Sequence, residues 1–126
     1  MPLATEAAKQ QTQEFPGPAR DKETVNIIKA VHSMWDRTQR EWAGTVARST
    51  QCANTQNCQF EKDLAAYMKQ GQGLDMSIMA TEKKHIAGQA LSDQDITDAA
   101  NHSHTLKDLV KTGNKLQSAL KQWFKM

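Results

Sequence analysis

The last third of the chain, residues 92–124, carries a long amphipathic pattern that begins with Ser92, Asp93 and Asp95. Apolar or small residues then recur at spacings of mostly three and four: Ile96, Ala99, Ser103, Leu106, Leu109, Val110, Gly113, Leu116, Leu120 and Trp123. This spacing places them on one side of a helix of roughly eight turns. A single helix cannot bury such a face by itself, so the rest of the chain must supply helices that cover it.

Two further segments have the same helical spacing. The first, residues 21–49, starts after a run of prolines with Asp21 as the expected N-cap. Its apolar face consists of Val25, Ile28, Val31, Trp35, Thr38, Trp42 and Val46. Trp35 and Trp42 lie seven residues apart on this face, and we expect them to pack in the core rather than to stack on a ligand.

The second segment, residues 57–90, contains the only ambiguity in the number of helices. Its apolar face consists of Phe60, Leu64, Tyr67, Gly71, Leu74, Ile78, Thr81 and His85. The phase is unbroken across Gly71–Gly73, which favours one long helix, whereas a turn at these glycines would produce a fourth helix. We expect this helix to end near Ala90, so that Leu91 and Ser92 form the whole connection. We expect His85 to be a hydrogen-bonded core residue.

The predicted fold is therefore all-α: an antiparallel up-down-up bundle of three long helices, or of four if the Gly71–Gly73 region is a turn. The bundle is expected to occupy residues 21–126, preceded by a flexible leader or tether at residues 1–20. A chain of 126 residues has room for one such domain. No apolar run is long enough to span a membrane, so we expect no transmembrane segment.

Cys52 and Cys58 flank a polar segment between the first two predicted helices. A disulfide between them would stabilise the fold by roughly 2 kcal/mol in the chain-entropy model, and it would indicate a periplasmic or extracellular location. The alternatives are two unpaired thiols or, less favoured, a metal or redox site. A zinc site would need two more ligands, and the spacing differs from that of a redox Cys-x-x-Cys motif.

The acidic and histidine residues of the last helix indicate surface ion pairs. Asp98 precedes His102 by four residues and His104 precedes Asp108 by four, so each pair can meet on a helix surface. Asp95, Asp98 and His102 could in principle hold a divalent ion, but His102 and His104 point in opposite directions and cannot share one. Because the sequence also has no nucleophile or phosphate-binding motif, we expect no catalytic residues, no metal site and no cofactor.

Two surface features are candidates for binding a partner. Lys107, Lys111 and Lys115 form a row at i, i+4 spacing, roughly opposite the predicted buried face of the last helix. The other candidate is the tip between the cysteines, with Asn54 and Gln56. The formal charge of +2 gives no general case for nucleic acid as a partner.

These features favour a non-catalytic, exported bacterial protein that binds another protein, as an inhibitor or immunity protein or as an accessory component of a secretion or conjugation system. The alternative is a cytoplasmic nucleic-acid-binding or regulatory helical protein that uses the lysine row. Homo-oligomerisation stays open in both interpretations.

Overall fold

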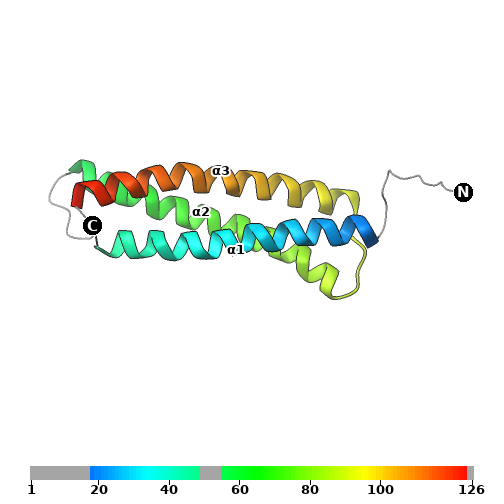
Figure 1. Cartoon of the computed structure of the whole chain (residues 1–126). Helices are drawn as coiled ribbons and strands as arrows, with labels where there is room; N and C mark the ends of the chain where they lie inside the picture. The colour runs from blue at the N-terminus through cyan, green and yellow to red at the C-terminus, as the bar shows by residue number, and fades with distance from the viewer. Residues whose placement is uncertain (1–17, 49–54, 125–126) are drawn as a thin grey trace, which may run out of the picture.

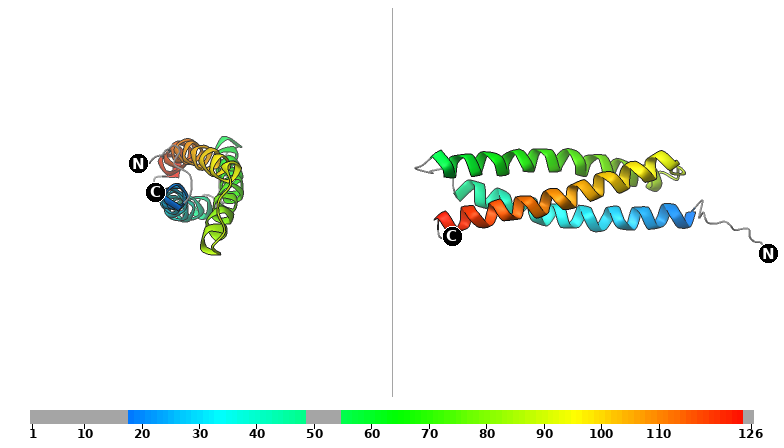
Figure 2. Two further views of the ribbon diagram at one scale, coloured as in Figure 1. Left: turned by 90° about the vertical axis from the view of Figure 1, so that its right-hand side faces the viewer. Right: turned by 90° about the horizontal axis from the view of Figure 1, so that it is seen from above.

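The computed structural model describes residues 18–48 and 55–124, which form three α-helices. They are α1 (Pro18–Arg48), α2 (Thr55–Ile86) and α3 (Asp93–Phe124). The helices α1 and α3 run in one direction and α2 runs between their ends in the other, as the colour gradient in Figure 1 shows. Seen along the long axis, the helices lie at the corners of a triangle (Figure 2, left). The predicted up-down-up bundle of three long helices is confirmed.

Helix α2 continues through Gly71 and Gly73, so the four-helix alternative is wrong. Gly71 is buried against the ring of Trp35 in α1. A Cβ at Gly71 would lie less than 3.0 Å from three carbons of that ring, closer than real Cβ contacts allow. At Gly73, in contrast, no atom of the described residues lies within 4 Å of the position of a Cβ. The first glycine therefore permits a close approach of α1 and α2 instead of ending a helix.

Both tryptophans of α1 lie in the core, as predicted. Trp35 and Trp42 are 4% and 0% exposed, and their rings meet edge to face at a centroid distance of 5.6 Å. Trp42 packs on Gly113 of α3 much as Trp35 packs on Gly71. Its indole Nε1 donates a hydrogen bond to Oδ1 of Asn114 at 2.9 Å, so the polar atom of this buried ring has a partner.

The predicted apolar faces form most of the core. The buried cluster consists of Ile28, Val31, Trp35, Trp42, Leu64, Ile78, Ala99, Leu106, Leu109, Val110 and Leu120. The prediction for His85 is wrong: its side chain is only half-buried and makes no hydrogen bond to a described residue. It lies within two residues of the end of α2, where the last turn extends beyond the core.

Two predicted helix ends are also corrected. Helix α1 begins at Pro18 rather than at Asp21, because proline fits the first position of a helix, where no backbone N–H is needed. Helix α2 ends at Ile86 rather than near Ala90. Gly88 follows with a φ of 83°, and the N–H groups of Gly88 and Gln89 donate to the carbonyls of His85 and Lys84. This is the Schellman arrangement that ends helices at glycine, so the connection to α3 comprises residues 87–92.

Helix α3 begins with a reciprocal capping box. Ser92 Oγ accepts a hydrogen bond from the backbone N–H of Asp95, and Asp95 Oδ2 accepts one from the backbone N–H of Ser92, both at 3.0 Å. Two of the backbone donors that a helix start leaves unpaired are thus satisfied. The predicted start of the last helix is confirmed at this position.

Candidate binding pocket between helices α1 and α3

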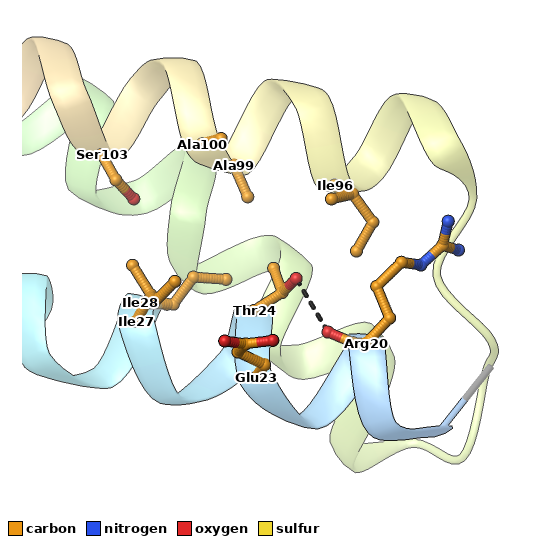
Figure 3. Close-up of a pocket in the computed structure, with 9 residues that line it drawn as sticks. All are labelled: Arg20, Glu23, Thr24, Ile27, Ile28, Ile96, Ala99, Ala100 and Ser103. Carbon is orange, nitrogen blue, oxygen red and sulfur yellow. Dashed lines mark hydrogen bonds between the residues drawn. The ribbon is translucent and has the colours of Figure 1, made fainter. Parts of the chain in front are cut away.

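A pocket of about 250 Å³ lies between the first turns of α1 and the first turns of α3 (Figure 3). We call it the α1–α3 pocket. Helix α1 contributes Arg20, Glu23, Thr24, Ile27 and Ile28, and helix α3 contributes Ile96, Ala99, Ala100 and Ser103. The two walls come together because α1 and α3 are parallel in the bundle and begin at the same end of it (Figure 1). The end of α1 and the start of α2 lie at the opposite end.

The walls of the pocket are mainly apolar, and one of them extends to the surface. Ile28 is fully buried, whereas its neighbour Ile27 is 48% exposed. Successive residues of a helix point about 100° apart, so Ile27 lies beside the core face of α1 and not on it. Ile96 of α3 is half-buried on the other wall. Ile27 therefore continues the apolar lining of the pocket out to the surface of the bundle.

Ser103 provides a hydrogen-bonding group within this apolar lining. The residue is 3% exposed, and its Oγ has no hydrogen-bond partner among the described atoms. In Figure 3 the Oγ points from α3 toward α1, into the space between the two walls. The hydroxyl of Thr24 differs, because it donates to the carbonyl of Arg20 at 3.0 Å. A buried hydroxyl without a partner costs roughly 1–3 kcal/mol, so a ligand that bonds to Ser103 Oγ would recover that free energy.

Arg20 closes the end of the pocket next to residues 87–92. Its Nη1 donates to Oδ1 of Asp93 at 2.6 Å and its Nη2 to the carbonyl of Leu91 at 3.1 Å. The guanidinium accordingly points away from the pocket and toward the connection (Figure 3). Asp21, the next residue, accepts a hydrogen bond from the N–H of Leu91. The charge of Arg20 is therefore used to hold the connection, and the pocket keeps its apolar lining.

The lysine row lies further along the same helix. Lys107, Lys111 and Lys115 are all exposed, and none of them forms an ion pair with a residue of the described part of the chain. Lys107 follows Ser103 by four residues, one turn along α3 and about 40° around it, so Lys107 lies at the edge of the buried face next to the pocket and not opposite that face as predicted. Of the three lysines, Lys107 is therefore the nearest to the pocket, and Lys111 and Lys115 follow one and two turns further along α3.

The other predicted binding residues lie outside the part that the structure describes. Cys52 and Asn54 belong to residues 49–54, and the side chains of Gln56 and Cys58 in the first turn of α2 are likewise outside the described set. The disulfide and the binding role of the tip therefore stay predictions.

The carboxylates considered for a metal site in α3 have other partners. Lys84 Nζ contacts Asp95 Oδ2 at 2.7 Å, and with the Ser92 backbone N–H it lowers the pKa of the Asp95 carboxyl. Asp98 accepts a hydrogen bond from Gln94 at 2.7 Å and does not pair with His102, so that predicted pair is wrong. Within residues 18–48 and 55–124, no group of three or more His, Cys, Asp or Glu side chains is arranged to hold a metal ion.

Two pairs between a histidine and a carboxylate are found within the described helices. The predicted pair of His104 and Asp108 forms, with 3.3 Å between Nε2 and Oδ2. A second pair was not predicted: His32 Nδ1 lies 2.8 Å from Oδ1 of Asp75 and joins α1 to α2. The two residues are distant in sequence, so no local spacing indicates their contact.

Among the described helices, none is both long enough and apolar enough to cross a membrane. The chain matches no family model, no curated protein and no solved structure.

Proposed function

We propose that this protein is not an enzyme and that it acts by binding another protein at the α1–α3 pocket and the adjoining lysine row. The observation that carries the proposal is that three features lie together at one end of the bundle. They are the half-exposed Ile27, the hydroxyl of Ser103, which has no partner among the described residues, and the exposed Lys107 one turn further along α3. Such a pocket offers apolar area and one buried hydroxyl that can bond to a ligand, and its lining residues form no arrangement of reactive groups.

The size of the pocket favours a protein over a separate small molecule. Pockets for drug-sized ligands measure roughly 300–1,000 Å³, whereas this one measures about 250 Å³. That volume suits one large side chain of a partner. Interfaces between proteins are commonly dominated by a few such anchors in well-packed pockets, with charges at the edge that guide association.

The location that we propose rests on the cysteines. A disulfide between Cys52 and Cys58 would require an oxidising compartment, so we propose export to the periplasm or beyond the cell. In that setting, an inhibitor or immunity protein, or an accessory component of a bacterial secretion or conjugation system, fits a small helical binding module. The Cys52–Cys58 tip would be a second contact at the far end of the bundle.

Capture from a nuclease-treated extract of the source cells tests the proposal. Immobilised full-length protein should retain one protein in stoichiometric amount at both 50 and 200 mM salt. Ile27→Asp should lose it, because a charge replaces apolar contact area beside the pocket. Met76→Asp is the matched control, since Met76 is a similarly exposed apolar residue (68%) on α2, outside the pocket.

Binding to nucleic acid would contradict this function. The exposed lysine row is the observation that favours that alternative. Phosphate contacts make affinity fall steeply with salt, by orders of magnitude between 50 and 200 mM when several charges are neutralised. Tight binding to DNA or RNA with that salt dependence, lost in the Lys107→Ala, Lys111→Ala, Lys115→Ala variant, would replace protein binding as the function.

A further inference from the structure

We infer that the α1–α3 pocket is an anchor site for a tyrosine side chain of the partner protein, and that acidic residues next to that tyrosine meet Lys107 and Lys111. The inference rests on the proposed function and specifies what the partner must present. It follows from three properties of the pocket: its apolar walls, a hydroxyl that no described residue bonds to, and the charge beside it.

The walls suit an aromatic ring. In Figure 3, Ile27 and Ile28 of α1 lie toward one end of the pocket and Ile96 of α3 lies toward the other, with the small Ala99 and Ala100 on the α3 wall between Ile96 and Ser103. A flat ring inserted against the alanines would contact branched side chains at both of its ends and would cover the exposed part of Ile27. Aromatic side chains bury about 150–250 Å² each and are enriched at the centres of interfaces.

The hydroxyl of Ser103 selects tyrosine over phenylalanine. A serine hydroxyl can both donate and accept, and so can a phenol. The phenol of an inserted tyrosine would thus form a hydrogen bond with Ser103 Oγ, and both hydroxyl groups would have a partner. A phenylalanine ring would exclude water from the pocket and leave this Oγ without any partner, which is the unfavourable outcome for a buried polar group. Thr24 does not provide an equivalent donor, since its hydroxyl donates to Arg20.

The charged residues around the pocket determine on which side of the tyrosine the partner's acidic residues should lie. Lys107 and Lys111 lie one and two turns beyond Ser103 on α3 and are exposed. Glu23 lines the pocket on the opposite wall, and Arg20 is engaged with Asp93. Carboxylates of the partner would therefore be attracted on the α3 side and repelled on the side of Glu23. These contacts are exposed, so they should steer association and weaken with salt.

The pocket can be tested on the full-length protein with p-cresol and toluene, which reproduce the side chains of tyrosine and phenylalanine. In titrations followed by NMR of ¹⁵N-labelled protein, p-cresol should cause saturable shifts in the amides of residues 23–28 and 96–103. Toluene should bind there about 3- to 10-fold more weakly, the difference that one hydrogen bond makes. Ser103→Ala should remove this preference, because its methyl group has no need for a partner. Ile27→Asp should weaken both ligands, and Met76→Asp should weaken neither.

The charge can be tested separately with synthetic peptides that carry one tyrosine followed by glutamates at helical spacing, with lysines in their place as the control. The acidic peptide should bind more tightly at 50 mM salt. The double variant Lys107→Ala, Lys111→Ala should remove that difference without changing the affinity for p-cresol. The same peptide with phenylalanine in place of tyrosine should bind the wild type more weakly than the tyrosine peptide does. The Ser103→Ala variant should bind the two peptides with equal affinity.

The possible failures are distinguishable. Equal binding of p-cresol and toluene to the wild type, or shifts elsewhere on the bundle, would overturn the tyrosine anchor even if a captured partner confirms protein binding. Binding of p-cresol as expected, together with no captured protein, would overturn the partner and assign the pocket to a small phenolic molecule. Concentration-dependent dimerisation that Ile27→Asp abolishes would assign it to a second copy of this chain.

Discussion

The carboxylate of Asp21 accepts a hydrogen bond from the backbone N–H of Leu91 at 3.0 Å, although 70 residues separate them. Arg20, the residue before Asp21, donates to the carbonyl of the same Leu91 at 3.1 Å. Leu91 is 3% exposed, so both of its backbone polar groups would otherwise be buried without partners. The first turn of α1 thereby fixes the connection that leads into α3, and with it the end of the α1–α3 pocket.

Asp21→Ala should lower the free energy of unfolding by roughly 1–3 kcal/mol, because it leaves the N–H of Leu91 buried and unpaired. Urea denaturation measures the loss, and hydrogen exchange at the Leu91 amide should show local opening. Asp36→Ala is the matched control: its ion pair with Arg40 is exposed at i, i+4 spacing, and such pairs contribute little. Equal losses in the two variants would contradict a structural role for the Asp21–Leu91 bond.

Gly113→Ala should destabilise the bundle, because its Cβ would overlap the ring of Trp42. Overpacking of this kind costs roughly 1–3 kcal/mol, against which the better helix propensity of alanine returns up to about 1 kcal/mol. Gly73→Ala should instead be stabilising by roughly 0.5–1 kcal/mol, since nothing lies near its Cβ position. Urea midpoints of the two variants should therefore move in opposite directions from wild type. Stabilisation by both substitutions would show that the Trp42–Gly113 contact is not close.

The helix number and order could be predicted from the sequence because each apolar face keeps its phase over many turns. Gly71 did not disturb that phase, and its role against Trp35 explains why a glycine is found there. The ends of the helices were harder to predict from the sequence. Asp21 resembles a cap in sequence, but Pro18 begins the helix first, and the carboxylate is used by a residue of another segment. The stop at Gly88 had a local signal, a glycine just after the last periodic residue, that the prediction overlooked.

The pocket could not be predicted from the local spacing of residues in the sequence. Ser103 was correctly assigned to the buried face of the last helix, yet whether its hydroxyl has a partner depends on side chains of α1 across the pocket. Ile27 lies off the apolar face of α1, and the sequence alone does not distinguish it from other exposed residues of that helix. Only the parallel arrangement of α1 and α3 brings these residues together.

Cys52→Ser should lower stability by roughly 1–3 kcal/mol if the predicted disulfide is present, in line with the loop-entropy estimate. Protein recovered from its native compartment under non-reducing conditions should contain no thiol that alkylating reagents reach without reduction. Cys52→Ser studied in the presence of reductant is the control, since wild type and variant should then be equally stable. Two freely alkylated thiols would remove the main support for export.

The dependence of stability on pH tests the contact between Lys84 and Asp95. The ammonium of Lys84, together with the Ser92 N–H, holds the pKa of Asp95 below its ordinary value of 3.8. The folded protein therefore stabilises the ionised form. This contribution is present above pH 3.8 and is lost as the pH falls through the lower pKa of the folded state. Asp95→Asn keeps an oxygen for the Ser92 N–H and removes only the charge, so it should be less stable than wild type at pH 7. The difference should shrink progressively below pH 3.8.

Asp108→Asn is the control, because its pair with His104 is exposed and the substitution should have little effect at either pH. A difference between Asp95→Asn and wild type that stays constant down to about pH 2 would show that the carboxylate charge is not its source.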